Sequence, residues 1–305
     1  MAAVAVITIG LGPALATATP LLGADLTTFT VLGGSTVTNV PTSAVVGNVG
    51  VWSSGGANAI TGFNSSPGVA VSDSQVTAGT VQAGTITGSP NAMSAQLQLA
   101  TAITSLGSLG PGTLEPADLS GLTLPPGVYT VPAGTTNLSG TLTLDGNGNA
   151  NAAWVFQLPS TLITSPDSGV NVISSGAGAG VYWNVGSSAT LGTNTAFLGN
   201  ILALDSVTLD NSATDRCGRV LAQTAAVTLQ QNSLSSDCTG LAADSGALSA
   251  GLSGGFNVTP SGSVDVLPYA SAPEPGTLSM LILGLVCIGF AARTRRPEAP
   301  KSMGA

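Results

Sequence analysis

A nineteen-residue spacing late in the chain constrains the fold more than any other feature. Glycine followed by an apolar run begins at Gly180, Gly199 and Gly218, nineteen residues apart twice. The triplet Val207-Thr-Leu209 recurs in the same region as Val227-Thr-Leu229. A period this short excludes helical repeats, most of which need about 33 residues or more. It fits one turn of a β-solenoid that is built from three short strands.

Each turn divides into a doubly apolar first strand, an alternating second strand and a more irregular third side. In the second strand Val207 and Leu209 point inward, so Thr208 points outward. The first strands are apolar on both sides, which requires a cover on their outer side. We assign first strands to Trp154–Leu158, Val181–Val185, Asn200–Leu204 and Arg219–Gln223, and second strands to Thr141–Leu144, Thr161–Thr164, Ser188–Gly192, Ser206–Asp210 and Ala226–Gln230.

One segment can supply that cover. Ser89 offers an N-cap and Pro90 suits the first helical position. Glycine and proline are absent from 91–106, and apolar residues recur there at helical spacing. We predict a helix over about 90–106 along the first-strand face, with Met93, Leu97, Ala100, Ile103 and Leu106 as its apolar positions.

The composition excludes several functions. Charged residues make up 7% of the chain, against roughly 25% in an ordinary globular protein. Between 19 and 272 only Arg216 and Arg219 are basic, against twelve acidic residues, so the body cannot neutralise a nucleic-acid backbone. Histidine is absent, and we expect no metal and no cofactor. Solenoids that act on polysaccharides need clustered acid–base groups, and regularly spaced Asp205, Asp210 and Asp215 fall on different parts of a turn, so we predict no enzyme.

Both ends of the chain resemble sorting signals. Residues 1–18 are apolar and end in Ala16-Thr-Ala18, as a secretory signal peptide does, although a buried N-terminal strand is the alternative. At the other end Pro273-Glu274-Pro275 precedes an apolar run and a basic cluster, and 273–297 resembles a PEP-CTERM sorting signal. That resemblance implies an exosortase-type processing enzyme and the outer envelope or exopolysaccharide matrix of a Gram-negative bacterium. A plain membrane anchor is the alternative.

The remaining boundaries follow from these assignments. The solenoid body is expected over 19–240, and 241–272 is rich in Ser-Gly runs and predicts a flexible linker. In an exported chain, Cys217 and Cys238 are expected to form one disulfide.

The body as a whole resembles the microbial ice-binding protein family. The matching segments are Phe29-Thr-Val-Leu-Gly-Gly-Ser-Thr-Val-Thr-Asn39, Gly47-Asn-Val-Gly50, Ile60-Thr-Gly-Phe63, Pro125-Pro-Gly-Val-Tyr129, Leu142-Thr-Leu-Asp-Gly146, Trp154-Val-Phe-Gln157, Gly199-Asn-Ile-Leu-Ala203 and Gly218-Arg-Val-Leu-Ala222. The resemblance spans roughly residues 26–234. It implies a discontinuous, right-handed parallel β-solenoid of triangular cross-section, dominated by β-structure, with one long α-helix along one face.

The same resemblance makes ice the expected partner. A surface that matches ice must be flat, repetitive and uncharged, and threonine offers a stiff side chain with one hydroxyl and one methyl. Outward positions of the second strands form a threonine and serine row. The short Thr-Ala/Gly-x-Thr/Asn motifs of some family members occur at Thr61 and Thr77, and also at Thr101 inside the predicted helix, which shows how loose the motif is. Candidate ice-binding residues are therefore Thr143, Thr161, Ser188, Thr190, Ser206, Thr208 and Thr228 in the row, and Thr61, Asn64, Thr77 and Thr80 in the motifs. The alternative function is a structural or adhesion protein of the cell surface or matrix, without ice activity.

Overall fold

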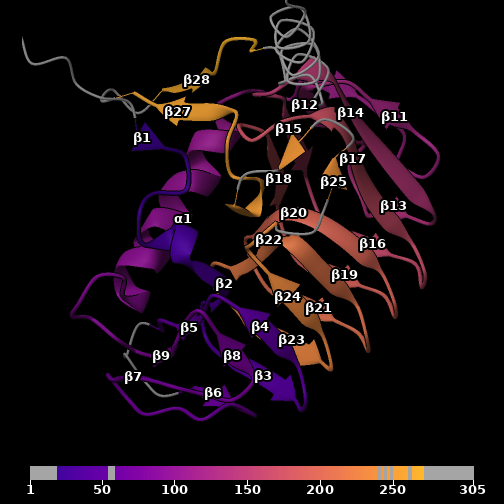
Figure 1. Ribbon diagram of the computed structural model, residues 1–305. Coiled ribbons are helices and arrows are strands. Elements are labelled where there is room, and N and C mark those ends of the chain that lie inside the picture. Colours follow the sequence, from indigo (N-terminus) through magenta and orange to yellow (C-terminus); the bar gives the residue numbers. More distant parts are fainter. Residues whose placement is uncertain are drawn as a thin grey trace, which may run out of the picture.

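The computed structural model describes residues 19–53, 59–238, 250–259 and 263–270, together with the backbone of the short strands β25 (Ala242–Ala243) and β26 (Gly246–Ala247). Its body is a β-solenoid with three faces and one long helix (Figure 1). The strands of neighbouring coils pair in parallel, with one antiparallel pair at the end where β7 meets β9. The predicted signal peptide (1–18) and sorting segment (273–297) lie outside the described residues.

The first face lies under the helix and is called the helix-covered face. Its strands follow the order β10 (Thr113–Leu114), β12 (Gly127–Thr130), β15 (Ala153–Leu158), β18 (Gly180–Val185), β20 (Ala196–Ala203), β22 (Thr214–Ala222), β2 (Phe29–Gly33), β5 (Asn48–Val51), β9 (Val81–Ala83) and β7 (Ala70–Val71). The predicted first strands all belong to this face.

The second face is a seven-stranded sheet, called here the threonine face. It comprises β13 (Thr136–Leu138), β16 (Leu162–Thr164), β19 (Ala189–Leu191), β21 (Val207–Leu209), β23 (Val227–Gln230), β3 (Val37–Val40) and β6 (Ile60–Thr61). The third face comprises β11 (Thr123–Leu124), β14 (Thr141–Asn149), β17 (Gly169–Ser175), the first residues of β20 and β22, β24 (Ser233–Ser235), β4 (Ala44–Val46) and β8 (Val76–Thr77).

The order of coils along the solenoid differs from their order in the chain. The coil that ends the repeat region pairs with the first coil of the chain, through Val220 with Val31 and Thr228 with Thr38. The N-terminal coils therefore extend the solenoid beyond its last repeat. This confirms the discontinuous solenoid that the resemblance implied, and it places N-terminal residues on the same faces as the repeats.

One assignment of a second strand is wrong. Thr141–Leu144 is part of β14 on the third face, and the second strand of that coil is β13. Leu142-Thr143-Leu144 carries the same apolar–threonine–apolar alternation as Val207-Thr208-Leu209, because both faces bury one side of each strand and expose the other. Alternation alone cannot tell the two faces apart.

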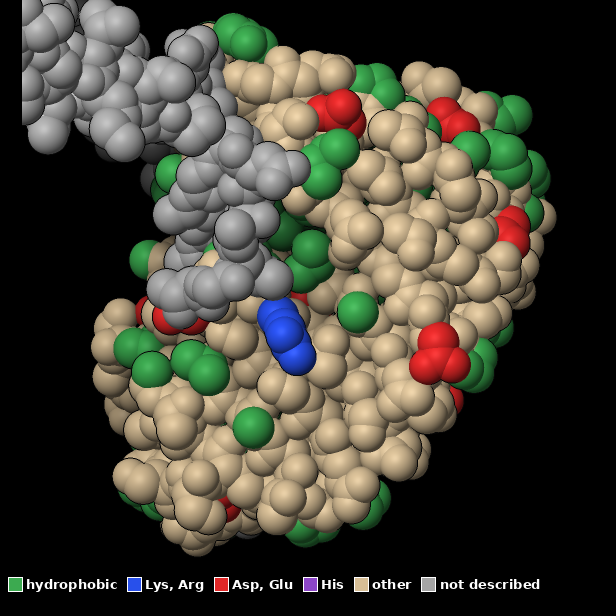
Figure 2. All heavy atoms as spheres, turned by 45° about the vertical axis from the view of Figure 1, so that its right-hand side comes forward, with side chains coloured by type: hydrophobic (Ala, Val, Ile, Leu, Met, Phe, Trp, Pro, Cys, Tyr) green, Lys and Arg blue, Asp and Glu red, His purple; other side chains and the backbone are tan. Residues whose placement is uncertain are grey.

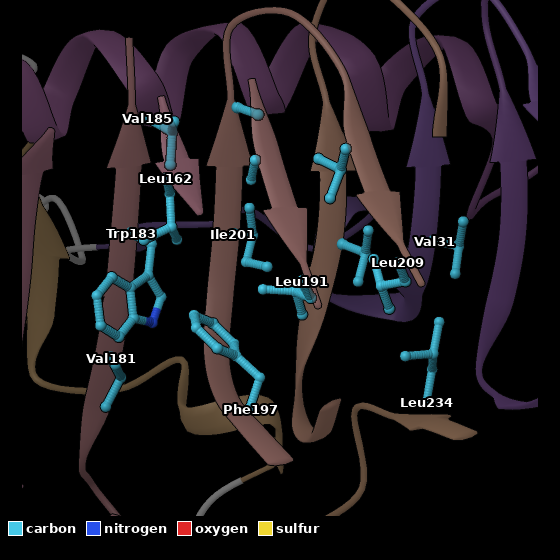
Figure 3. Packing of buried hydrophobic residues seen from close by; sticks show 14 of the residues in the cluster. Val31, Leu162, Val181, Trp183, Val185, Leu191, Phe197, Ile201, Leu209 and Leu234 are labelled. Carbon is cyan, nitrogen blue, oxygen red and sulfur yellow. The ribbon is translucent and has the colours of Figure 1, made fainter. Parts of the chain in front are cut away.

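A stack of aromatic rings fills part of the solenoid interior. The ring centroids of Phe156 and Trp183 are 4.1 Å apart with planes 9° apart, and Phe197 and Tyr129 extend the stack on either side. Figure 3 shows Trp183 and Phe197 among aliphatic side chains from several coils. Trp183 is fully buried and donates its indole N–H to the Leu198 carbonyl at 3.1 Å, which satisfies its polar atom. The rigid interior supports the faces from behind.

Helix α1 (Ala92–Gly107) covers the first-strand face as predicted. Two details differ. The N-cap is Asn91, whose side chain accepts from the Ser94 N–H at 2.9 Å, and Ser89 plays no such part. The buried stripe consists of Ala92, Ala95, Leu99, Ala102 and Leu106, whereas Leu97 of the predicted stripe is 62% exposed. Small alanines let the helix lie close to the doubly apolar strands.

The segment after residue 249 corrects the prediction of a flexible linker over 241–272. Its described part contains η2 (Ala250–Leu252), β27 (Phe256–Val258) and β28 (Val264–Val266), and the last two form a sheet with β1 (Thr19–Pro20). Leu252 is buried with the apolar residues inside the solenoid, and Phe256 is buried with those between helix α1 and the helix-covered face. Sparse patterning in the sequence hid these two anchors. We call residues 250–270 the C-terminal strap.

Within the described residues, no helix combines the length and the apolar character needed to cross a membrane. Over the same residues, no three acidic or cysteine side chains come together as a metal site would require.

Candidate functional site

The centre of the threonine face is a single row of outward side chains, one from each strand. Register pairs each member with the next, from the coil of β13 to the coil of β6. On the six strands β13, β16, β19, β21, β23 and β3 the residues on either side of the outward one are buried, which fixes its direction. The row reads Asn137, Ile163, Thr190, Thr208, Thr228, Thr38 and Thr61.

Five consecutive threonines form most of this row, and no charged residue stands in it. Their β-branched side chains have few rotamers, so hydroxyl and methyl groups are held in fixed positions. Neighbouring strands lie about 4.8 Å apart, which sets the repeat along the row. Ile163, which is 43% exposed, replaces the hydroxyl by an apolar group near one end.

A second row of small side chains flanks the first, two residues earlier on each strand. Backbone hydrogen bonds between coils place its members in register: Thr135, Thr161, Ser188, Ser206, Ala226, Thr36 and Ala59. Hydroxyls of adjacent coils bond to each other here, with Thr161 donating to Thr135 at 3.1 Å and Ser206 to Ser188 at 2.9 Å. The two rows are about 6.6 Å apart along the strands, so together they form a two-dimensional array.

The other flank of the central row is less regular. Residues two positions later include Asp210 and Gln230, which adjoin through the register of β21 and β23, and then Val40, which is 50% exposed. Asp210 is the charge that borders the array. Over the surface that Figure 2 shows, acidic side chains are few and widely separated.

The edge where the threonine face turns into the third face is built in a similar way in four successive coils, of which the fourth has a turn one residue shorter. Asp167, Asn194, Ser212 and Gln231 each adopt a left-handed backbone conformation, with φ between 54° and 62°, and hydrogen bonds between coils hold them in register. Inside this edge the buried Asn232 donates to the carbonyls of Asp210 and Ala213 at 2.8 and 2.9 Å. The first three turns also share one hydrogen bond, from Ser168 N–H to Ser165, Thr195 N–H to Gly192 and Ala213 N–H to Asp210, and this repetition keeps the strands that precede them aligned.

The three faces differ in regularity. Pairings on the threonine face run through all seven strands without a shift of register. The sheet that forms the other two faces has shifts between Asp145 and Asn149, Phe29 and Val31, and Phe197 and Gly199. Bulges bend and twist a strand locally. The threonine face is therefore the face with the most regular strand pairing among the described residues.

The structure brings most of the predicted row together. Thr190, Thr208, Thr228 and Thr61 stand in the central row, the last of them predicted through its short motif. Thr161, Ser188 and Ser206 stand in the flanking row. The placement of these residues follows from the structure, while their role in binding stays a prediction.

Four predicted residues lie elsewhere. Thr143 and Thr77 are on the third face, in β14 and β8. Thr80 donates to the Asn48 side chain at 3.1 Å, beyond the end of β8. Asn64 follows β6, and its side chain donates to the Ser72 carbonyl at 2.8 Å. The short motif thus marks turns at the ends of strands and does not identify one face.

Four polar members of the array were missed by the sequence analysis: Asn137, Thr135, Thr36 and Thr38. Val37-Thr38 repeats the start of the Val-Thr-Leu triplet, so a search of the N-terminal segment for the repeat would have found Thr38. Asn137 carries no such signal, because its triplet Thr136-Asn-Leu138 buries a threonine.

Elsewhere the structure bonds Cys217 to Cys238, with Cα atoms 4.7 Å apart, which confirms the predicted disulfide. Beside it, Asp215 and Arg219 are buried. Burial raises the pKa of Asp215 well above its ordinary value, against the opposing influence of backbone N–H groups and Arg219. Burial lowers the pKa of Arg219 to about 10, so it is a cation at neutral pH.

Comparisons with known proteins agree on one family. The model of the Ice-binding-like family matches residues 31–235, and the PEP-CTERM protein-sorting motif matches residues 271–296. An ice-binding protein of Nostoc sp. (strain HG1) is 46% identical over 211 residues, which cover 69% of this chain and 72% of that protein.

Solved structures give the same result. An ice-binding protein of the Antarctic ascomycete Antarctomyces psychrotrophicus is 31% identical, with a TM-score of 0.59 over 72% of this chain and 98% of its own. The ice-binding protein of an Arctic yeast, whose structure was solved to explain antifreeze activity, is 28% identical, with a TM-score of 0.63 over 71% of this chain and 93% of its own.

Proposed function

Because this chain belongs to the Ice-binding-like family, we propose that it binds ice and that the threonine face is the surface that adsorbs. The observation that carries the proposal is the register of seven strands with five consecutive threonines, Thr190, Thr208, Thr228, Thr38 and Thr61, in an uncharged central row. Named relatives from several organisms are ice-binding proteins, which supports the same function here.

The physical basis is a match of spacing and chemistry. Ice presents a regular lattice of water oxygens, and the two rows present hydroxyls and methyls at repeats of about 4.8 and 6.6 Å. Each hydroxyl contributes about 1 kcal/mol net at most. Adsorption therefore needs many groups that act together on a rigid plate, which the in-register strands and repeated turns supply. Adsorbed protein pins the growing ice front and inhibits recrystallisation.

No catalytic step is part of this function. The three regularly spaced aspartates lie apart: Asp205 accepts from Ser187 at the edge beside the helix-covered face, Asp210 borders the threonine face, and Asp215 is buried. Acids that are so distributed cannot cooperate as a general acid and base.

The PEP-CTERM match favours a second function that is compatible with the first. A protein sorted by this motif is exported and held by its C-terminal segment. Its partners are then an exosortase-type enzyme and, in the matrix, exopolysaccharide, and its location is the outer envelope of a Gram-negative bacterium. A structural protein of the cell surface without ice activity would have the same sorting motif.

One measurement separates the two functions. Ice recrystallisation and crystal shape are recorded with the purified protein, its disulfide intact, against an equal mass of a globular protein without affinity for ice. Fine grains and faceted crystals at micromolar protein are expected. Coarse grains and round crystals from a folded sample would leave the structural role.

A further inference from the structure

Both ends of the C-terminal strap lie on one edge of the solenoid, the one where the third face turns into the helix-covered face, while β27 and β28 between them pair with β1 and pack beside helix α1. In successive coils that edge lies between β14 and β15, between β17 and β18, and within β20 and β22. The strap contacts four of these coils in turn. The position of the strap therefore determines from which edge of the solenoid the C-terminal segment leaves.

The first contacts are made by a buried cation. Arg219 in β22 donates to the Gly251 carbonyl at 3.2 Å, to Asn200 Oδ1 at 2.8 Å and to the Thr27 carbonyl at 2.6 Å. Asn200 in turn donates to the carbonyls of Gly251 and Leu252 at 2.8 and 2.9 Å. Since charge-assisted bonds of a buried group are among the stronger ones, the start of the strap is fixed to the solenoid and to the N-terminal segment.

The next coil holds the middle of the strap. Gly254 donates its N–H to the Ala179 carbonyl at 3.0 Å, and its carbonyl accepts from the Tyr182 hydroxyl at 2.8 Å. A Cβ on Gly254 would lie 2.1 Å from the Gly178 carbonyl oxygen, so the strap backbone lies directly on this turn.

The last contacts lie at the turn between β14 and β15. Asn151 Nδ2 donates to the Pro268 carbonyl at 2.9 Å, Ala270 N–H donates to Asn149 Oδ1 at 3.1 Å, and Ala150 N–H donates to the Ala270 carbonyl at 2.6 Å. The sorting motif matches from residue 271 onward. The described chain thus reaches the start of its sorting segment while still bound to this edge.

In a solenoid of three faces, the edge shared by two faces lies opposite the third. The strap edge joins the third face and the helix-covered face, so it lies opposite the threonine face. Figure 1 shows the same separation, with β27 and β28 on one side of the molecule and β16, β19 and β21 on the other.

We propose that the strap makes this protein a two-ended tether, which binds ice through the threonine face while its C-terminus is attached to the cell surface. The proposal rests on the proposed function. Attachment through a segment that leaves from the opposite edge keeps the threonine face clear of the surface to which the protein is bound. Force on the tail passes through the strap into four coils, at the edge opposite the threonine face.

The docking of the strap can be tested without ice. Amide hydrogen exchange is measured on the full chain and on the double variant Asn149→Ala, Asn151→Ala, with Asn171→Ala on the exposed third face as the control. Each variant removes only side-chain amides. We expect the Ala270 amide to be protected in the wild type and in the control, and to exchange about tenfold faster in the double variant. An unprotected Ala270 amide in the wild type would overturn the proposal.

The tether itself is tested by attachment in two orientations. The full chain carries one azide-bearing residue, added after Ala305 or replacing Gln230 on the threonine face, and is coupled to beads through it. Each protein is first assayed uncoupled, for recrystallisation inhibition. We expect a growing ice front to take up the beads coupled at the C-terminus, and to take up beads coupled at position 230 at least about tenfold less, since many copies act together on each bead.

Two failures are distinguishable. Rejection of the C-terminally coupled beads, with an uncoupled protein that inhibits recrystallisation, overturns the tether and leaves the proposed function intact. If the uncoupled wild-type protein has no effect on ice, both the proposed function and the tether are overturned. The exchange rate of the Ala270 amide then tests only whether the strap is docked on the solenoid.

Discussion

The threonine face and the third face are made from the same kind of strand, yet only one of them is a regular plate. Both alternate apolar and threonine residues, as Val207-Thr208-Leu209 does on the first and Leu142-Thr143-Leu144 on the second. The difference lies in the segments that come after the strands. Three strands of the threonine face end in turns of the same length with the same hydrogen bond, and a fourth ends in a shorter turn that also has a left-handed residue, whereas strands of the third face lead into register shifts at Asp145 and Phe197.

Repetition of the turns, more than composition of the strands, therefore makes a surface suited to a crystal lattice. The third face also carries an exposed charged residue, Arg216, whereas the central row of the threonine face contains no charged residue. Substitutions on one face, with the other face as the reference, test this difference.

The largest effect is expected from a bulky side chain in the central row. Thr208→Tyr places a ring between Thr190 and Thr228, and this ring holds the ice lattice away from the threonine face. Because weak contacts must act together, recrystallisation inhibition should fall by about tenfold or more. Thr143→Tyr on the third face is the matched control, with the same change in the same sequence pattern. Equal losses in both variants, or none in Thr208→Tyr, would show that the threonine face is not the adsorbing surface.

Removal of the disulfide should separate stability from activity. Cys217→Ser with Cys238→Ser opens a link between residues 21 apart, at the edge opposite the threonine face. The free energy of unfolding should fall by about 3 kcal/mol, as measured by urea denaturation. Recrystallisation inhibition near 0 °C should be unchanged, because the strands of the threonine face are far from the link. Loss of activity in a variant that is still folded would contradict this prediction and would show that changes at the strap edge affect the threonine face.

Much of this comparison could be anticipated from the sequence, and the missing part has a physical cause. The period of nineteen residues predicted the coils, and the alternation around Thr190, Thr208 and Thr228 predicted an outward row. Two features could not be predicted in this way. The first is the choice of face: alternation is the same on both half-buried faces, so Thr143 was placed on the wrong one.

The N-terminal strands are the second gap. The pattern around Thr38 marks an outward threonine but does not show which coil lies beside it. Thr38 and Thr61 join the row through pairing of the first coil with the last, a contact between residues 190 positions apart, Thr38 and Thr228. The ordered structure of the strap could not be predicted from the sequence for a similar reason. Its anchors, Leu252 and Phe256, are isolated apolar residues in a small, polar segment, and their burial depends on the turns of coils far away in sequence.

The melting temperature should depend on pH through Asp215, which is buried behind the third face. Burial raises the pKa of Asp215 in the folded protein, so folding favours its protonated form. The stability that comes from this shift is complete below the unfolded value of about 3.8 and is lost as pH rises through the folded value. The melting temperature should therefore rise as pH falls from neutral to about 5.

Asp215→Asn is the control for this titration, since an amide of the same shape cannot ionise. The dependence on pH should be weaker in that variant. Asp118 should not contribute to this pH dependence. Burial raises its pKa, but hydrogen bonds from Ser139 and Ser120 lower it by more, so the pKa is below its ordinary value and the carboxylate stays ionised above about pH 5. A variant with the same slope as the wild type would assign the effect to the general negative charge of the body.

The smallest effect is expected from completing the row. Ile163 interrupts it between Asn137 and Thr190, and Ile163→Thr adds one hydroxyl at the position that the register prescribes. One more group worth about 1 kcal/mol at most should raise inhibition by roughly twofold. Asn171→Thr makes a matched addition beside Thr143 on the third face and should change nothing. If both additions raised activity equally, any exposed threonine would serve, and the regular turns of the threonine face would not be what selects the surface. A gain for Ile163→Thr alone would show that register, and not threonine content, decides which face adsorbs.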